Sequence, residues 1–380
     1  MTASARQAAM PELETMPGSE QALARVEAWF AGEVIDRPPV RFMAHNAFLE
    51  QAKEDISSLS PAQRKAWWFD AELQVSLFEQ SIAGQTFHGE TFPVYWPNLG
   101  PEVYAAFYGS ELVYGEVTSW SIPLIRDEED ASRLRLDIDN DYFRTLEAMT
   151  ALALERCAGS YLVGYTDLHP GLDCVAAWRD PQQLCLDLID RPELVETLAE
   201  KAIADFETIY DHFDAMLKAA GQLSVSWMGI PSRGRLHIPS CDFASMISPA
   251  FFRRFGLPIL EREVRTMSHN VFHVDGKGIA RHLEAILSVA EVHALQWVQG
   301  MGDDQPILQW LPFLKDLQAR RVPVVVDLSL RELEPFIARM APEGLFLWIA
   351  TENEAEEQAV LDRLLRWTRG QGRPGPRGGG

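Results

Sequence analysis

Short apolar runs alternate along the chain with longer stretches whose apolar residues recur at helical spacing. The runs are rich in β-branched and aromatic residues, and most precede a helical stretch, which is typical of a parallel α/β architecture. Their interiors are apolar on both faces, as in a sheet covered on both sides. We therefore predict a single-domain (β/α)8 TIM barrel of about eight strands, at residues 40–44, 91–96, 161–165, 223–228, 270–275, 294–298, 322–327 and 345–349.

The two ends of the chain lie outside this repeating pattern. An amphipathic stretch at residues 21–32 predicts an N-terminal helical extension. We expect residues 1–18 and the Gly-, Pro- and Arg-rich residues 370–380 to be disordered, which leaves residues 19–369 for the barrel. A doubly wound sheet is the alternative fold. It usually carries a glycine-rich first turn, and no Gly-x-Gly-x-x-Gly follows an early strand here.

The stretch Asn-Val-Phe-His-Val-Asp-Gly at residues 270–276 joins a β-prone start to two side chains suited to chemistry. His273 and Asp275 are two positions apart, so a strand presents them on one face. The strand then breaks at Gly276, at the carboxyl end where barrel active sites lie. This indicates a metal site or an acid/base pair, and the alternative is a hydrogen-bonded pair that only fixes the turn. A metal site needs a third ligand, which this spacing does not supply.

Polar and aromatic side chains also gather at or near the other predicted strand ends. Asp167 and Asp173 are candidates to orient a substrate or move a proton, although Asp173 is equally suited to cap a helix. Tryptophans at these ends are more often core or pocket wall than chemistry, and loop arginines are as often solvated as bound to a carboxylate. The candidates for substrate binding are Tyr95, Trp96, His169, Trp227, Arg233, Gln296 and Asp327.

The charge balance narrows the range of partners. Lys+Arg total 34 against Asp+Glu 55, which gives a formal net charge of -21. Such a chain repels a phosphate backbone and an anionic bilayer, so we expect no nucleic-acid or membrane partner. No apolar run reaches the roughly 20 residues of a membrane span. The four cysteines form no Cys-x-x-Cys pair, and a reduced, cytoplasmic setting is the simplest expectation.

Three short stretches carry a resemblance to a known family. They are Asp-Arg-Pro-Pro-Val at 36–40, Ile-Ser-Pro at 247–249 with a further proline at 258, and His-Val-Asp-Gly at 273–276. Over residues 37–367 the chain resembles the uroporphyrinogen decarboxylase superfamily. That group contains porphyrinogen decarboxylases and zinc-dependent methyltransferases that take methyl groups from corrinoid proteins. The last stretch resembles the His-x-Cys-Gly of those methyltransferases, whose His and Cys bind zinc.

The resemblance implies a TIM barrel and a metal-dependent, methyltransferase-like enzyme. Zn²⁺ or another divalent ion would bind His273 and Asp275, with Cys241, Asp242 or Glu352 completing the set. A small-molecule substrate and a corrinoid carried by a partner protein are then implied. The loop after the first strand lacks the arginines of the porphyrinogen decarboxylases, so we do not expect an octacarboxylate substrate.

Two other functions remain open at this point. In one, a metal-independent decarboxylase or lyase uses His273 and Asp275 as an acid/base dyad, with Arg233 or Arg235 holding a small carboxylate. In the other, the barrel is a non-catalytic binder of a tetrapyrrole or a small acid. A homodimer is as compatible with the sequence as a monomer.

Overall fold

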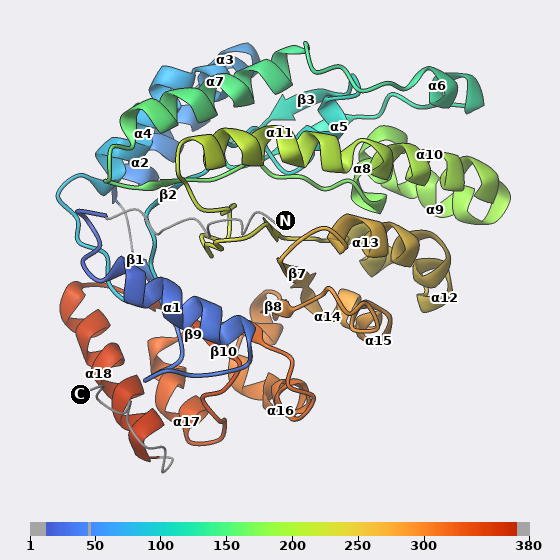
Figure 1. Cartoon of the computed structure of the whole chain (residues 1–380). Helices are drawn as coiled ribbons and strands as arrows, with labels where there is room; N and C mark the ends of the chain where they lie inside the picture. The colour runs from blue at the N-terminus through green and yellow to red at the C-terminus, as the bar shows by residue number, and fades with distance from the viewer. Residues whose placement is uncertain (1–12, 45–46, 371–380) are drawn as a thin grey trace, which may run out of the picture.

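The main element of the fold is a curled, six-stranded parallel sheet with the strand order β1, β10, β9, β8, β7, β6 (Figure 1). The computed structural model describes residues 13–44 and 47–370. The predicted α/β class with a parallel sheet is confirmed. The strands are β1 (Val40–Ala44), β6 (Leu236–His237), β7 (His269–Asp275), β8 (Ala294–Val298), β9 (Val324–Ser329) and β10 (Leu345–Thr351).

A second parallel pair, β2 (Val94–Tyr95) and β5 (Leu162–Val163), lies beside β1. The backbone N–H of Glu90 donates to the Val40 carbonyl at 2.7 Å, which ties the approach to β2 onto β1. On the other side of the pair, the N–H of Tyr165 donates to the Val225 carbonyl at 2.9 Å. The described strands thus form a curled sheet and a separate pair rather than one closed ladder of eight.

The strands predicted at 91–96 and 161–165 are too long, and the strand predicted at 223–228 is wrong. Pro93 has no N–H to donate to a ladder, and β2 begins only after it. Residues 223–228 form no parallel strand, because the chain turns back at Gly229, where φ is 63°. Ser224 then pairs antiparallel with Ser232. The two-residue strand β6, which follows this turn, was not predicted.

Helices cover the outside of the strands, with α16, α17 and α18 on one side in Figure 1 and α4, α7 and α11 on another. Residues 61–82 form two helices, because Asp70 ends the first and its side chain caps the second by accepting from the Leu73 N–H at 3.0 Å. The α-helices of five or more residues are α1 (Ser19–Phe30), α2 (Ala47–Ser57), α3 (Pro61–Phe69), α4 (Ala71–Ile82), α6 (Glu128–Arg133), α7 (Asp141–Arg156), α8 (Leu172–Arg179), α9 (Pro181–Asp190), α10 (Pro192–Ala204), α11 (Phe206–Ala219), α13 (Leu257–Val264), α14 (Gly276–Ala280), α16 (Leu311–Ala319), α17 (Leu333–Ile337) and α18 (Glu354–Gly370).

Residues 102–121 contain both a short helix and a hairpin. A single helical turn, α5 (Val103–Ala106), is followed by an antiparallel hairpin of β3 (Glu111–Tyr114) and β4 (Ser119–Ile122). None of the helices in the described part of the chain is long and apolar enough to cross a membrane.

Alternate residues of each strand belong to two different hydrophobic clusters. Val271, Ala294, Val325 and Phe346 lie in the cluster on the concave inner side of the sheet. Their neighbours, such as Phe272, pack outward against the helices. Since side chains alternate between faces with a period of two, the position of any strand residue follows from its parity.

The inner cluster is closed at the amino ends of the strands by the N-terminal segment. In α1, the Trp29 side chain is fully buried and its indole N–H donates to the Gly344 carbonyl at 3.1 Å. Leu13 and Met16 are also buried in this cluster. Ordered contacts therefore begin before the boundary predicted at residue 19, while residues 1–12 and 371–380 of the predicted disordered ends lie outside the described residues.

Candidate functional site

The carboxyl ends of the strands carry a layer of polar side chains on the inner face. His273 and Asp275 share the parity of the inner core residue Val271. Gln296 follows Ala294 in the same way, and it stands opposite His273 in the register of β7 and β8. The alternation that buries valines lower in the sheet therefore points these polar groups into the concave side at its open end.

The imidazole of His273 is oriented by two neighbours. Its Nδ1 lies 2.6 Å from the Oε1 of the buried Gln296, so the Nδ1–H donates and Nε2 keeps its lone pair. The indole of Trp227 packs against the ring at right angles, with 5.3 Å between the ring centroids. An imidazole held in this tautomer is suited to bind a metal ion or accept a proton through Nε2.

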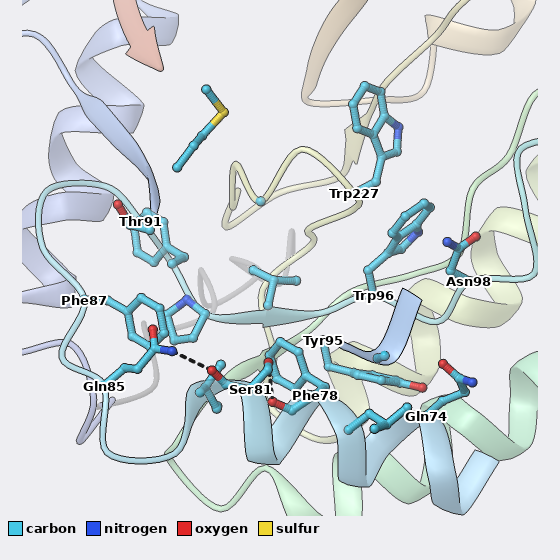
Figure 2. Close-up of a pocket in the computed structure, with 18 of the residues that line it drawn as sticks. Gln74, Phe78, Ser81, Gln85, Phe87, Thr91, Tyr95, Trp96, Asn98 and Trp227 are labelled. Atoms are coloured by element: carbon cyan, nitrogen blue, oxygen red, sulfur yellow. Dashed lines mark hydrogen bonds between the residues drawn. The ribbon is translucent and has the colours of Figure 1, made fainter. Parts of the chain in front are cut away.

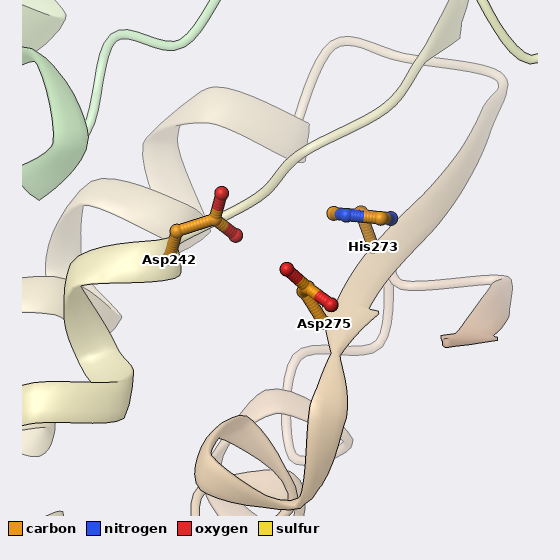
Figure 3. A group of neighbouring side chains, drawn as sticks. All are labelled: Asp242, His273 and Asp275. Carbon is orange, nitrogen blue, oxygen red and sulfur yellow. The ribbon is translucent and has the colours of Figure 1, made fainter. Parts of the chain in front are cut away.

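Three side chains meet at this point (Figure 3). One ligand atom from each of Asp242, His273 and Asp275 lies within 4.8 Å of the other two. His273 and Asp275 come from β7, whereas Asp242 begins the 3-10 turn η1 (Asp242–Met246). The chain before η1 runs alongside β7, since the His273 N–H donates to the Pro239 carbonyl at 2.9 Å, and this brings the third carboxylate to the strand end.

Asp173 holds the backbone of the Asp242 loop. Its carboxylate, near the start of α8, accepts hydrogen bonds from the N–H groups of Asp242 at 2.9 Å and Phe243 at 2.8 Å. Partial loss of hydration at the Asp242 carboxyl, in a residue that is exposed overall, and the nearby charge of Asp173 raise the pKa of Asp242 to about 6. A carboxylate kept close to other carboxylates favours a cation between them.

Asp167 and His169 extend this network away from Asp242. The His169 Nε2 lies 2.8 Å from the Asp167 carboxylate, and its Nδ1 lies 3.0 Å from the Ser240 hydroxyl. Burial lowers the pKa of His169, but the charge and hydrogen bond of Asp167 outweigh it and raise the pKa to about 9. The imidazolium is therefore the stable form at neutral pH, and the chain of contacts runs Asp167, His169, Ser240, Asp173.

Asp327 and Arg41 form a second pair of charges on the inner face. Burial raises the pKa of Asp327 to about 6, although Arg41 and His273 oppose the shift. Burial lowers the pKa of Arg41 to about 10, and its guanidinium lies over the Trp348 ring at 4.7 Å. Sequence reasoning missed Arg41, and the available signal was a single charge inside the otherwise apolar first strand.

A cavity of about 620 Å³ opens beside this polar layer (Figure 2). Tyr95, Trp96 and Trp227 line it, three of the side chains predicted to bind a substrate. Trp227 belongs to both places, because it lines the cavity and contacts the His273 ring. Arg41 also lines the cavity. Asp242, His273 and Asp275, called the ligand group because their atoms lie close enough to hold a metal ion, are thus adjacent to the cavity.

Several other candidates lie elsewhere or are engaged with other groups. Arg233 forms ion pairs with Glu20 and Glu27 of α1, at the amino ends of the strands. Arg235 pairs with Asp211 on α11. The Cys241 thiol is buried outside the three-residue group, and burial raises its pKa well above the ordinary value, which opposes a metal-binding thiolate. Of the three proposed additional ligands, it is Asp242 that the fold places beside His273 and Asp275.

Comparison with solved structures finds a related fold. A methyltransferase from Methanosarcina mazei superposes with a TM-score of 0.57 over 91% of this chain and 98% of that one, at 14% sequence identity. An identity this low shows a shared fold and nothing about the reaction. No family model and no curated protein sequence matches the chain.

Proposed function

We propose that this protein is a metal-dependent, methyltransferase-like enzyme built on the closed (β/α)8 barrel of the uroporphyrinogen decarboxylase superfamily. The observation that carries the proposal is the convergence of Asp242, His273 and Asp275 within 4.8 Å at the carboxyl end of β7. The fold match over 91% of the chain supports the barrel part of the proposal. The substrate is a small molecule, and the methyl group is exchanged with a corrinoid on a partner protein that docks on the open end of the strands.

The donor set fits a divalent ion. Zinc, manganese and similar ions hold nitrogen and oxygen ligands at about 2.0–2.2 Å, so three donors within 4.8 Å need only small side-chain rotations to converge on one centre. One imidazole and two carboxylates form a harder set than the sulfur-rich one of the related methyltransferases, and suit zinc or a more oxygen-loving ion. When bound, such an ion lowers the pKa of a substrate thiol or water and so supplies a nucleophile at neutral pH.

The surrounding residues position the ligands and the substrate. Gln296 fixes the His273 tautomer, and Asp173 fixes the loop that presents Asp242. Since its carboxylate already accepts two backbone N–H groups, we assign Asp173 to positioning rather than to proton transfer. Asp167 and His169 hold Ser240 in the same loop. Trp227 lies at the boundary between the ligand group and the cavity, where it contacts the His273 ring.

Metal titration of purified protein tests this proposal. Zinc, manganese and magnesium are added to metal-stripped wild type and binding is followed by calorimetry, alongside Asp242→Asn and Asp275→Asn. Asp303→Asn is the matched control, because Asp303 is an exposed carboxylate outside the ligand group. We expect stoichiometric binding to wild type and the control, and loss of binding in both ligand variants. Equal binding by all four proteins, or none by wild type, would refute the metal site.

The corrinoid part of the proposal has its own test. Methylcobalamin serves as a free substitute for the partner's methylated cofactor, and transfer of its methyl group to a thiol acceptor is followed by absorbance as cob(I)alamin forms. We expect metal-dependent methylation that His273→Ala abolishes. A non-catalytic binder would show no methylation in either protein.

A metal-independent decarboxylase is not favoured by the arrangement. That hypothesis needed Arg233 or Arg235 to hold a substrate carboxylate beside His273. Both guanidinium groups are instead paired with carboxylates on helices, Arg233 with α1 and Arg235 with α11.

A further inference from the structure

Aromatic rings form a large part of the wall of the cavity beside the ligand group. Its lining includes Trp67, Phe78, Phe87, Tyr95, Trp96 and Trp227. In Figure 2, Trp96 and Trp227 lie on the side of the cavity away from Phe87 and Gln85. Flat aromatic walls favour a planar ring, since stacked and edge-to-face contacts add to the burial of apolar surface. A volume of about 620 Å³ is within the range of cavities that hold small-molecule ligands.

Two hydrogen-bond donors in this wall have no acceptor. The indole Nε1 atoms of Trp96 and Trp227 are buried and have no hydrogen-bond partner in the described part of the chain. A buried N–H without an acceptor is costly, so native structures provide a partner from the protein, from water or from a ligand. Both indoles line the cavity, and a ligand with oxygen acceptors would satisfy them.

Arg41 supplies a further set of donors. Its guanidinium lines the cavity and donates to the Met228 carbonyl, the acceptor found for it among the described residues. With five N–H donors, it has others to offer. Two carboxylates, Glu116 and Glu357, also line the cavity, so the charge of the wall by itself selects neither an anion nor a cation. The arginine therefore adds to the indoles as a donor for oxygen acceptors.

From these contacts we infer that the substrate is a planar aromatic compound of one or two rings whose oxygen substituents accept hydrogen bonds from Trp96, Trp227 and Arg41. This inference rests on the proposed function and names its substrate class. Because Trp227 contacts His273, the oxygen-bearing end of the ring faces the ligand group. The opposite end lies among the apolar rings toward Phe87.

Equilibrium binding of three matched probes tests the substrate class. The probes are 4-methoxybenzoate, its saturated counterpart 4-methoxycyclohexanecarboxylate, and the cation (4-methoxyphenyl)trimethylammonium, each titrated by calorimetry. We expect 4-methoxybenzoate to bind at least about fivefold more tightly than the saturated acid, because aromatic contacts add roughly 1 kcal/mol. The cation should bind more weakly than 4-methoxybenzoate, because it has no carboxylate oxygens to accept from Arg41 and the indoles. Equal affinity for the saturated acid, or tighter binding of the cation, would overturn the inference.

Removing one indole N–H while keeping a ring sharpens the test. Trp96→Phe should weaken 4-methoxybenzoate binding by about fivefold to a hundredfold, the range for losing a buried hydrogen bond. Trp367→Phe is the control, since its indole N–H is also buried and unpaired but lies outside the cavity lining. If Trp96→Phe does not fold, Trp227→Phe makes the same test. Unchanged affinity in the folded cavity variant would refute the donor assignment.

Metal titration of the same variants separates this inference from the proposed function. Trp96→Phe should bind metal as wild type does. Metal binding without aromatic binding overturns only the substrate class. Aromatic binding without metal binding overturns the proposed function and leaves the cavity assignment standing.

Discussion

The ligand group and the aromatic cavity differ in how their polar atoms are paired. Around Asp242, His273 and Asp275, hydrogen bonds fix the groups that present the ligand atoms: Gln296 bonds His273, and Asp173 bonds the loop of Asp242. In the aromatic cavity, the indole donors have no partner in the described residues. A hydrogen-bonded network with a concentration of negative charge keeps its geometry and favours binding of a cation. A cavity wall with unpaired donors favours binding of a molecule that has hydrogen-bond acceptors.

This difference shows where binding energy is available in the protein. The ligand group is held in place by its surroundings, so its occupant should cause little rearrangement. The cavity has unpaired donors, so its occupant should stabilise the protein by satisfying them. Most of the substitutions below change one of these two parts, and we expect binding at the other part to be unaffected.

Asp275→Asn should have the largest effect. Removing a direct ligand should weaken metal binding by more than about a hundredfold, since even outer partners of metal ligands contribute 10–100-fold. Without metal, the variant should be as stable as wild type or more so, because one of the two adjacent carboxylates of the ligand group is neutralised. Thermal unfolding with and without zinc measures both effects. A variant whose Tm still rises with zinc as in wild type would contradict the assignment.

Asp173→Asn should have the next largest effect. The amide keeps one acceptor oxygen but replaces the other with an NH₂ group that faces a backbone N–H, so one of the two bonds to the Asp242 loop is lost. We expect metal affinity to fall by about 10–100-fold, with 4-methoxybenzoate binding unchanged. Calorimetry with each ligand measures the separation. Equal loss for both ligands would mean that Asp173 supports the whole site rather than the loop.

The pairing of His169 with Asp167 predicts a pH dependence. The folded pKa of His169 is raised to about 9, above its ordinary value of 6.5. The stabilisation is therefore fully present below pH 6.5 and is lost as the pH rises through 9. We expect wild type to lose on the order of 1–3 kcal/mol of unfolding free energy across that interval relative to His169→Gln. Urea unfolding at several pH values measures it, and parallel slopes for the two proteins would contradict the pairing.

The sequence predicted the ligand group better than the cavity, for a physical reason. His273 and Asp275 were readable because a strand has a period of two and a glycine marks its end. Asp242 was only one of three candidates, since its place depends on how a long loop runs beside β7. Arg41 was missed because the alternation of residues in the first strand does not show which of its two faces points to the concave inner side of the sheet. Neither a cavity nor an unpaired donor has a sequence signature, because both depend on packing between distant segments.

Arg233→Gln should have the smallest effect on stability and binding, and it serves as a control because Arg233 was wrongly predicted to bind the substrate. Its guanidinium joins Glu20 and Glu27 of α1, and both of these carboxylates are substantially exposed. Ion pairs of this kind contribute roughly 0–1 kcal/mol because solvent screens them. Arg233→Gln should therefore lower the free energy of unfolding by less than about 1 kcal/mol and leave both metal and 4-methoxybenzoate affinities unchanged. A large loss of 4-methoxybenzoate binding alone would return Arg233 to the substrate site. It would also contradict the contrast between the hydrogen-bonded ligand group and the cavity with unpaired donors. The acceptor oxygens of 4-methoxybenzoate would then be bound by a side chain from the opposite end of the strands.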